Sequence, residues 1–552
     1  MRRFLILMCL PMLVAGSCLA QYEISADSLR THIAVLASDS LEGREVGEAG
    51  ELKAAAYIQA VFEHAGIAPR GDNGGYLQEF DFIKRIELGP ENRLTVNGTD
   101  LEPQVDFLPL HQSADTSFSF SSIVDVGYGI ITDDSSHNDY AGLDVAGKPV
   151  LIRRHTPPAP EHDTIAADTT FDRFADLNTK ILTALQHDAA GVFFITPTDH
   201  DDTLMGTGVT RVASKDVPIV FLRRHALEKL SLDLDAPNLQ SLVGATDLER
   251  VRDTGYNVLG YLPGRSSSTI IIGAHYDHLG WGGPSSRYTG EEKRIHYGAD
   301  DNGSGTAALL ELARHYRARE ETNRHSMLFI AFSGEEAGLL GSSYFVRNWT
   351  VNRDSALMMI NMDMIGRLQE QEKGLLAMGV GTAQEFADFF EARDTAGLKV
   401  TVTQSGAGPS DHAAFYNDSI PVLNFFTGAH EDYHKPSDVA ELIDYDGIVK
   451  VTDLVTDVIS CLDDYTDMLT FVRTKDAGPG GRRTSLSVTL GVMPDFVSEV
   501  KGFRIDGVSP DRPGDRAGLI KGDIIIRLGN VTIDDIYAYM SALGKLRKGD
   551  ST

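Results

Sequence analysis

The chain has 552 residues, and at about 150 residues per domain this length predicts about three domains. A hydrophobic content of 42% and a charged content of 23% are typical of a soluble globular protein. The net charge of −29 argues against nucleic acid or an anionic membrane as a partner.

The first twenty residues have the order of a secretory signal peptide. Two arginines precede an apolar run from Phe4 to Ala15, and small residues lead up to Ala20. We therefore expect export to the periplasm or the extracellular space, with a lipid anchor on Cys18 or a buried helix as alternatives. No later segment reaches about eighteen uninterrupted apolar residues, so no membrane span is expected. Cleavage after Ala20 would leave Cys461 without a partner for an intrachain disulfide.

Two helices are predicted next, followed by an insert of short strands. Apolar residues recur at helical spacing across Ser25–Ala37 and Glu51–Ala65, with a loop at 40–47 between them. From residue 118 the pattern changes to strands with a single helix, which predicts a compact α/β insert. Its predicted elements are the strands Phe118–Val126, Pro149–Arg153, Gly191–Ile195 and Val217–Leu222 and the helix Leu177–His187.

Residues 256–465 alternate apolar strands with helices. This pattern predicts an α/β fold whose mainly parallel sheet is covered by helices on both faces. The predicted strands are Thr269–Ala274, Met327–Phe332, Leu357–Asn361 and Pro421–Phe426, and the predicted helices are Gly305–Arg319, Ala383–Ala396 and Tyr445–Leu462.

A Gly/Pro/basic linker, Asp476–Arg483, precedes a small third domain with strands at Ser485–Val492, Gly502–Val508 and Gly522–Leu528 and a helix at Ile533–Leu543. The predicted domain limits are 1–20 for the signal peptide, 21–117 and 249–468 for the domain of the large sheet, 118–248 for the insert, 469–484 for the linker and 485–552 for the tail domain.

Metal-type side chains follow the strands of the large sheet. In open α/β sheets this edge binds ligands, so side chains from five distant segments are expected to converge there. Imidazoles and carboxylates suit zinc, with manganese or cobalt as weaker options, and five ligands exceed the three that one catalytic zinc takes. A carboxylate can bridge two ions about 3.5–4 Å apart, so two ions are predicted. The segments contribute His275 and Asp277, Asp300 and Asp301, Glu335 and Glu336, Asp363, and His434.

Each of these residues also has an ordinary interpretation. A histidine after a strand is often a satisfied polar residue, Glu335 and Glu336 could be solvated, and Asp300 and Asp301 could cap the following helix. That account needs five coincidences at one sheet edge, so the metal interpretation is favoured.

At these residues the chain resembles the co-catalytic dizinc aminopeptidase family, which has glutamate carboxypeptidase and glutaminyl cyclase relatives. The likeness covers nearly all of residues 25–465. It includes the stretch Leu36–Arg44 and, in family order, a His-x-Asp pair, the Gly-Ala-Asp-Asp-Asn-Gly-Ser-Gly loop at 298–305, a Glu-Glu pair, an Asn-x-Asp-Met turn and a Tyr-His-x-x-x-Asp loop.

The resemblance implies a role for each matching residue. His275 and Asp363 would bind one zinc ion, Glu336 and His434 the other, and Asp301 would bridge them. Glu335 would be the general base that takes a proton from the metal-bridging water and passes it to the leaving amine. Asp277 would orient the histidine ligand. Two further residues, His412 and Tyr433, would line the substrate pocket.

The flanking regions resemble known accessory domains. The insert is similar to a protease-associated domain, carried by residues 126–130, 139–148 and 189–192, which in this family may limit substrate access. The tail resembles a PDZ domain through Val508–Pro510, Arg516–Leu519 and Gly522–Ile525, and it stops before the last strand of such a domain. Leu490–Val492 could bind peptide C-termini there, with a purely structural appendage as the alternative.

The resemblance therefore implies an exported dizinc metallo-aminopeptidase that acts on peptides. A carboxypeptidase or dipeptidase of the same family is the alternative, because Arg287, Arg294, Arg367 and Lys435 could meet a substrate carboxylate. A non-catalytic binding protein and a glutaminyl cyclase are weaker alternatives, because both ion sites and Glu335 are present.

Overall fold

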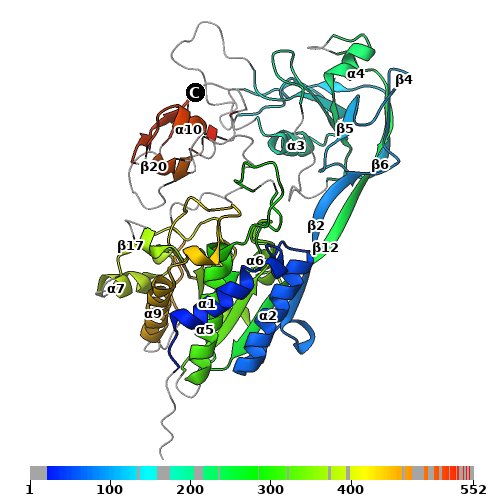
Figure 1. Ribbon diagram of the computed structural model, residues 1–552. Helices are drawn as coiled ribbons and strands as arrows, with labels where there is room; N and C mark the ends of the chain where they lie inside the picture. Colours follow the sequence, from blue (N-terminus) through cyan, green and yellow to red (C-terminus); the bar gives the residue numbers. More distant parts are fainter. Residues whose placement is uncertain are drawn as a thin grey trace, which may run out of the picture. The chain divides into compact units, whose positions relative to one another are not determined.

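The computed structural model describes residues 22–474 and parts of 490–546 (Figure 1). Within the first range it leaves out 133–136, 158–174, 204–214, 234–236, 284, 320–322, 371–373, 393–397, 463–464 and 466–467. The predicted signal peptide and residues 475–484 of the predicted linker lie outside the described residues. No helix among the described residues is long and apolar enough to cross a membrane.

The central element is a nine-stranded sheet, ordered β1-β12-β14-β13-β15-β18-β16-β17 with β2 paired to β12. Its middle strands are parallel: β13 lies between β14 and β15, and β15 also pairs with β18. These strands coincide with the predicted ones to within a residue or two at each end, which confirms the mainly parallel α/β fold. They are β13 (Thr269–His275), β14 (Ser326–Phe332), β15 (Ala356–Met362) and β18 (Val422–Phe426).

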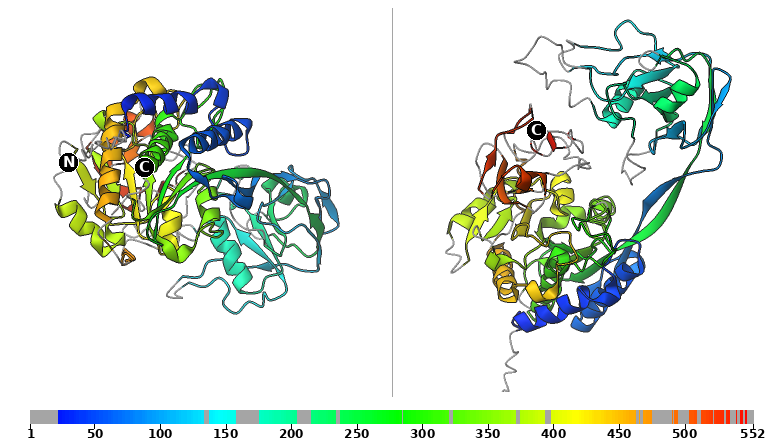
Figure 2. Two further views of the ribbon diagram at one scale, coloured as in Figure 1. Left: turned by 90° about the horizontal axis from the view of Figure 1, so that it is seen from below. Right: turned by 45° about the horizontal axis from the view of Figure 1, so that its top comes forward.

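Antiparallel strands extend this sheet on both sides, and the sequence pattern did not predict them. β12 (Leu248–Leu262) runs antiparallel to β14, and β16 (Leu375–Met378) runs antiparallel to β18. β12 also pairs with β2 (Leu77–Leu88), beside which it lies (Figure 2). Charged residues alternate with apolar ones in this ribbon, so it lacks the continuous apolar run by which the central strands are recognised. The remaining strands are β1 (Ala68–Pro69) and β17 (Val400–Val402).

Helices cover both faces of the sheet because its strands alternate their side chains between two cores. Ile270 and Ile272 face the core that contains α1, α2, α5 and α9, of which α1, α2 and α5 are seen together in Figure 1. Ile271 faces the second core, with Phe345 and Phe415. The first group of helices is α1 (Ala26–Leu36), α2 (Ala49–Ala65), α5 (Gly305–Ala318) and α9 (Tyr445–Leu462), and the second is α6 (Leu340–Phe345) and α8 (His412–Asn417). The predicted helix at 383–396 is α7 (Gln384–Ala392).

The chain divides into two compact units, one of residues 1–79 and 256–481 and one of residues 80–255 and 482–552. The first contains the large sheet. In the second, β5-β10-β9-β8-β7 form one sheet and β4-β3-β11-β6 another. β3 and β4 lie upstream of residue 118 yet pair into the sheet of β11, so the strand pairing extends the insert beyond its predicted start. Its elements are β3 (Arg93–Val96), β4 (Thr99–Leu101), β5 (Phe107–Pro109), β6 (Thr116–Phe120), β7 (Val124–Asp125), β8 (Pro149–Arg153), α3 (Leu177–Gln186), β9 (Gly191–Ile195), β10 (Ile219–Leu222), α4 (Arg224–Lys229) and β11 (Leu242–Thr246).

The described part of the tail contains a three-stranded sheet and a hairpin around a small apolar core. The predicted strand at 502–508 is β20 (Phe503–Val508), whereas most of the predicted strand 485–492 and helix 533–543 lies outside the described residues. The other elements are β19 (Val492–Pro494), α10 (Pro513–Arg516), β21 (Ile524–Ile525), β22 (Arg527–Leu528) and β23 (Val531–Thr532). The protease-associated and PDZ-like assignments stay predictions.

Candidate metal centre

One group of ligand atoms lies where β13 and β15 end. The Nε2 atom of His275 is 3.3 Å from Oδ1 of Asp363 and 3.4 Å from Oδ1 of Asp301. These three side chains could together hold a metal ion. Two ligands that each lie about 2.0–2.1 Å from a tetrahedral zinc ion are about 3.3 Å apart, so the spacing fits that ion.

A second group shares Asp301 through its other oxygen. Oδ2 of Asp301 is 3.3 Å from Nε2 of His434, and the same nitrogen is 3.3 Å from Oε2 of Glu336. These distances again equal the edge of a tetrahedral zinc site. Asp301 therefore directs one oxygen to each group, which is the arrangement that a bridging carboxylate requires.

Hydrogen bonds fix the orientation of both imidazoles. Nδ1 of His275 faces the main-chain oxygen of Asp277 at 3.2 Å, and Nδ1 of His434 faces the main-chain oxygen of Ser285 at 2.8 Å. Since a carbonyl oxygen only accepts, each Nδ1 carries the proton and each Nε2 is left for a metal ion. Tyr433 stacks on His434 with 3.8 Å between the ring centroids.

Asp277 connects two strand ends. Its carboxylate accepts hydrogen bonds from the main-chain N–H groups of Glu335, at 3.1 Å, and of Glu336, at 3.3 Å. It also lies 3.6 Å from Nδ1 of His275. One buried carboxylate thus holds the loop after β13 against the loop after β14, as an orienting residue should.

The loop that carries Asp301 is held by two buried side chains. Asp438 accepts hydrogen bonds from the main-chain N–H groups of Asp300, at 2.9 Å, and Asp301, at 3.1 Å. Asn302 donates to the carbonyl of Met362 at 2.9 Å, which ties the loop to the end of β15. The peptide bond between Asp301 and Asn302 is cis.

The charges of the site favour a cation. Burial acts to raise the pKa of Asp301, but the imidazoles of His275, His278 and His434 outweigh burial and hold this pKa well below its usual range. Burial acts to lower the pKa of His434, but the carboxylates of Glu336 and Asp301 raise it well above its usual value. A metal ion would take the place of these protons among the same ligands. The residues present therefore fit the zinc ions that the sequence predicts.

Of the other predicted site residues, Glu335 lies next to a proposed ligand, whereas His412 has no hydrogen bond to the ligand atoms within the described part of the chain. Glu335 is buried beside Glu336, just after β14. His412 starts α8 and is fully buried, and neither of its ring nitrogens has a hydrogen-bond partner among the described residues. Burial lowers the pKa of His412 to about 3, so this imidazole is neutral at working pH. No hydrogen bond links it to the ligand atoms within the described part of the chain.

Sequence reasoning gave no role to two residues of the site. Nδ1 of His278 lies 3.0 Å from Oε1 of Glu336. Its position three residues after His275 is the feature of the sequence that could have marked His278 as part of the site. The Arg44 guanidinium donates to the carbonyls of Tyr276, Tyr297 and Gly298, at 2.6, 2.8 and 2.9 Å, and also to Leu36. Its contacts could not be inferred from the sequence, because they join loops far apart in the chain.

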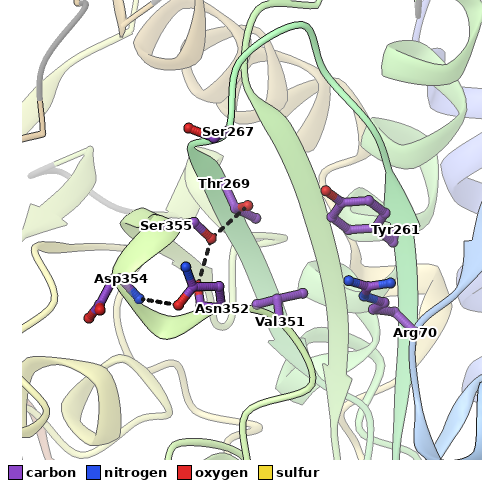
Figure 3. Close-up of a pocket in the computed structure, with 8 residues that line it drawn as sticks. All are labelled: Arg70, Tyr261, Ser267, Thr269, Val351, Asn352, Asp354 and Ser355. Atoms are coloured by element: carbon purple, nitrogen blue, oxygen red, sulfur yellow. Dashed lines mark hydrogen bonds between the residues drawn. The ribbon is translucent and has the colours of Figure 1, made fainter.

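A pocket at the other edge of the sheet does not contain such ligands. It lies at the amino ends of β13 and β15, where the hydroxyls of Thr269 and Ser355 are 3.3 Å apart (Figure 3). Asp354 is the single acid among its lining residues, and no histidine lines it. This pocket therefore lacks the set of imidazoles and carboxylates found at the carboxyl edge.

The fold and the site define an α/β protein with a two-centre imidazole–carboxylate site at the carboxyl edge of a mainly parallel sheet. Residues 257–459 match the family model described as Peptidase family M28. All the proposed ligand residues lie within the matched range.

Similar sequences include a probable leucine aminopeptidase of Trichophyton verrucosum, 29% identical over 206 residues, which are 35% of this chain and 54% of the relative. Aminopeptidase YwaD of Bacillus subtilis is 28% identical over 253 residues, 44% of this chain and 50% of the relative. The chain thus spans about half the length of these curated relatives.

Similar solved structures include an aminopeptidase from Aneurinibacillus sp. strain AM-1, with 22% identity, a TM-score of 0.48 and coverage of 83% of this chain and 98% of that chain. Another is the zinc aminopeptidase BSAP from Bacillus subtilis, with 22% identity, a TM-score of 0.44 and coverage of 83% and 97%.

Proposed function

We propose that this chain is a metallo-aminopeptidase that hydrolyses N-terminal residues from peptides at a centre of two zinc ions. The observation that carries the proposal is the bridging position of Asp301, which directs Oδ1 to His275 and Oδ2 to His434. The names of the sequence relatives, several of them leucine aminopeptidases, support release of N-terminal residues.

The proposed ligands divide into two sets. His275 and Asp363 would hold the first ion, Glu336 and His434 the second, and Asp301 both. Two bound zinc ions would polarise the scissile carbonyl and lower the pKa of a water molecule between them. The bonds of His275 to Asp277 and of His434 to Ser285 keep the Nε2 atoms directed toward the ions.

Glu335 would move the proton. Its main-chain N–H is bonded to Asp277, so the residue is held at the end of β14 next to the ligand Glu336. As a general base, its carboxylate would take a proton from the attacking water and deliver it to the amine of the leaving peptide. Tyr433 and His412 would line the pocket, with Tyr433 stacked on His434.

The alternative is a carboxypeptidase or dipeptidase, which needs a cation for the substrate carboxylate. Arg367 was one candidate, but its guanidinium is buried and lies 3.3 Å from Asp432 and 3.4 Å from Asp438. Arg294 pairs with Glu292 at 3.5 Å on the surface. These ion pairs make Arg367 and Arg294 poor receptors for another carboxylate, because acids already engage both cations. The alternative then depends on Lys435 and on Arg287, whose guanidinium lies 5.9 Å from the centroid of the Tyr433 ring.

A substrate panel tests the proposal. The rates of hydrolysis of leucyl and other aminoacyl p-nitroanilides are compared with those of the same compounds blocked at the amino group. The proposal predicts hydrolysis of the free substrates alone, and activity confined to the blocked ones would contradict it.

Export and the accessory domains belong to the same proposal. Residues 1–20 would be removed on export to the periplasm or the extracellular space. The insert would limit access to peptide substrates, and the tail would bind peptide C-termini. N-terminal sequencing of the secreted protein tests the first of these points.

A further inference from the structure

His278 lies against the second group of ligand atoms in a fixed position. Its side chain is fully buried, and its main-chain N–H donates to the carbonyl of Arg44 at 3.2 Å. The ring packs directly on Gly298, where a Cβ would lie 2.6 Å from two of its carbons. Since Gly298 has a φ of +58°, a side chain there would be strained as well, so the backbone preserves this packing.

The two oxygens of Glu336 face two different imidazoles. Oε1 is 3.0 Å from Nδ1 of His278, whereas Oε2 is 3.3 Å from Nε2 of His434. The rings of His278 and His434 are edge to face, with 5.9 Å between their centroids. Glu336 is therefore contacted by one imidazole on each oxygen.

The distances to Asp301 separate the roles of the two imidazoles. Nε2 of His434 is 3.3 Å from Oδ2 of Asp301, which equals the edge of about 3.3 Å between two ligands of a tetrahedral zinc. Nδ1 of His278 is 3.8 Å from the same oxygen, and its 3.0 Å from Glu336 is a hydrogen-bond distance. The contact of His278 with Glu336 therefore has the length of a hydrogen bond, although His278, Asp301 and Glu336 are also close enough together to hold a metal ion.

We propose that His278 is a positioning residue for Glu336: its Nδ1–H donates to Oε1 and leaves Oε2 for the second zinc ion. An ionised carboxylate accepts but cannot donate, so Nδ1 carries the proton. A bond to a charged acceptor is stronger than one between neutral groups, and it would hold Glu336 to the ion through a single oxygen. This inference rests on the two-ion site of the proposed function.

Two substitutions at position 278 separate a donor from a ligand. The amide nitrogen of His278→Asn occupies nearly the position of Nδ1 and keeps an N–H donor, whereas His278→Leu removes it. Zinc affinities of the full chain are measured by competition with a chromophoric chelator, together with the number of ions bound. We expect the Leu variant to bind one of its two ions about 10–100-fold more weakly and the Asn variant to stay within a few-fold of wild type.

His296→Asn is the matched control. The ring of His296 lies 6.5 Å from that of His278 and is bonded to Ser286 and Arg294, so wild-type zinc affinity is expected. An Asn variant at 278 as weak as the Leu variant would overturn the proposal, because the imidazole itself would then be a ligand. An unchanged Leu variant would overturn it too. A wild-type chain that saturates with one ion would contradict the two-ion proposal before any variant is compared.

A second measurement detects the ring proton of His278 in the wild type directly. Nitrogen-15 NMR of histidine-labelled, zinc-loaded wild type distinguishes protonated, bare and metal-bound ring nitrogens. We expect a protonated Nδ1 in His278, with the signals assigned by their loss in His278→Asn. A metal-bound Nδ1 would overturn the proposal.

Discussion

At the scale of single residues, the site is organised by carboxylates that each contact two different partners. Asp301 faces His275 with one oxygen and His434 with the other, at 3.4 and 3.3 Å. Asp277 lies 3.6 Å from Nδ1 of His275 and accepts a hydrogen bond from the main-chain N–H of Glu335. Each residue is thereby fixed from two sides, which is the preorganisation that metal and proton chemistry need.

The proposed base is tested by Glu335→Gln. The amide cannot accept a proton, so the rate is expected to fall by about 10²–10⁴, or more if this group is indispensable. Zinc content and thermal unfolding should stay at wild-type values, because the main-chain bond to Asp277 persists. The measurement is kcat on leucyl p-nitroanilide, and a fully active variant would refute this role.

Asp438 is expected to act through Asp301. In Asp438→Ala, the main-chain N–H groups of Asp300 and Asp301 lose their acceptor and the buried Arg367 loses a partner. We predict a zinc affinity about 10–100-fold weaker and a loss of about 2–4 kcal/mol in the free energy of unfolding. Chelator competition and urea unfolding measure these changes.

Asp418→Asn is the surface control for that variant, because Asp418 pairs with Arg353 in a partly exposed position. A change below about 1 kcal/mol is expected there. Equal effects in the two variants would contradict the special role of Asp438.

At the scale of elements, Arg44 joins the loop before α2 to the loop after β13 and to the residues that precede Asp301. Burial lowers the pKa of this guanidinium to about 10, so it stays charged at neutral pH, with Asp277 and Asp301 nearby. Arg44→Lys cannot reach the same carbonyls with a single ammonium group. We expect the free energy of unfolding, measured with urea, to fall by about 2–4 kcal/mol. Arg347→Lys, at an exposed position, should change stability by less than about 0.5 kcal/mol.

A second buried group ties α1 to α5. Burial acts to raise the pKa of Glu311, but hydrogen bonds from His32, Ser28 and Tyr22 outweigh it and hold the pKa at about 2. Because the folded pKa is depressed, the stabilisation is present above the unfolded value and is lost as the pH falls from about 4.5 to about 2.

The matching variant is Glu311→Gln. At pH 7 it should unfold more easily than wild type by up to about 3 kcal/mol, from the shift of about 2.5 pH units. The difference between the two proteins should shrink as the pH falls below about 4.5. Urea unfolding at several pH values measures it, and a difference that is constant with pH would contradict the assignment.

Much of this architecture follows from sequence pattern, because β13, β14, β15 and β18 are continuous apolar runs that need burial on both faces. His275, Glu336 and Asp363 became candidate ligands because they lie at or just after the ends of β13, β14 and β15. Asp301 and His434 lie in longer loops, before α5 and after β18. β12 was missed because its charged residues hide a strand that pairs on both sides. The contacts of His278 and Arg44 depend on distances between loops, which no spacing in the sequence encodes.

At the scale of the whole molecule, bound zinc should stabilise the fold. The proposed ligands come from five segments of the chain and are not preassembled in the unfolded state, so binding free energy adds to folding free energy. An ion at 100 times its dissociation constant contributes about 2.7 kcal/mol. We expect a chelator to lower the melting temperature and zinc to restore it, whereas magnesium, which prefers all-oxygen sites, should not. Calorimetry of the full chain measures both effects.

A zinc titration of the metal-free full chain shows whether five side chains hold two zinc ions. Bound zinc and hydrolysis of leucyl p-nitroanilide are followed together in the wild type, in His275→Asn and in His434→Asn. We expect the wild type to bind two equivalents of zinc and to be active, and each variant to bind one equivalent. Saturation of the wild type at one equivalent, or two equivalents in either variant, would contradict it.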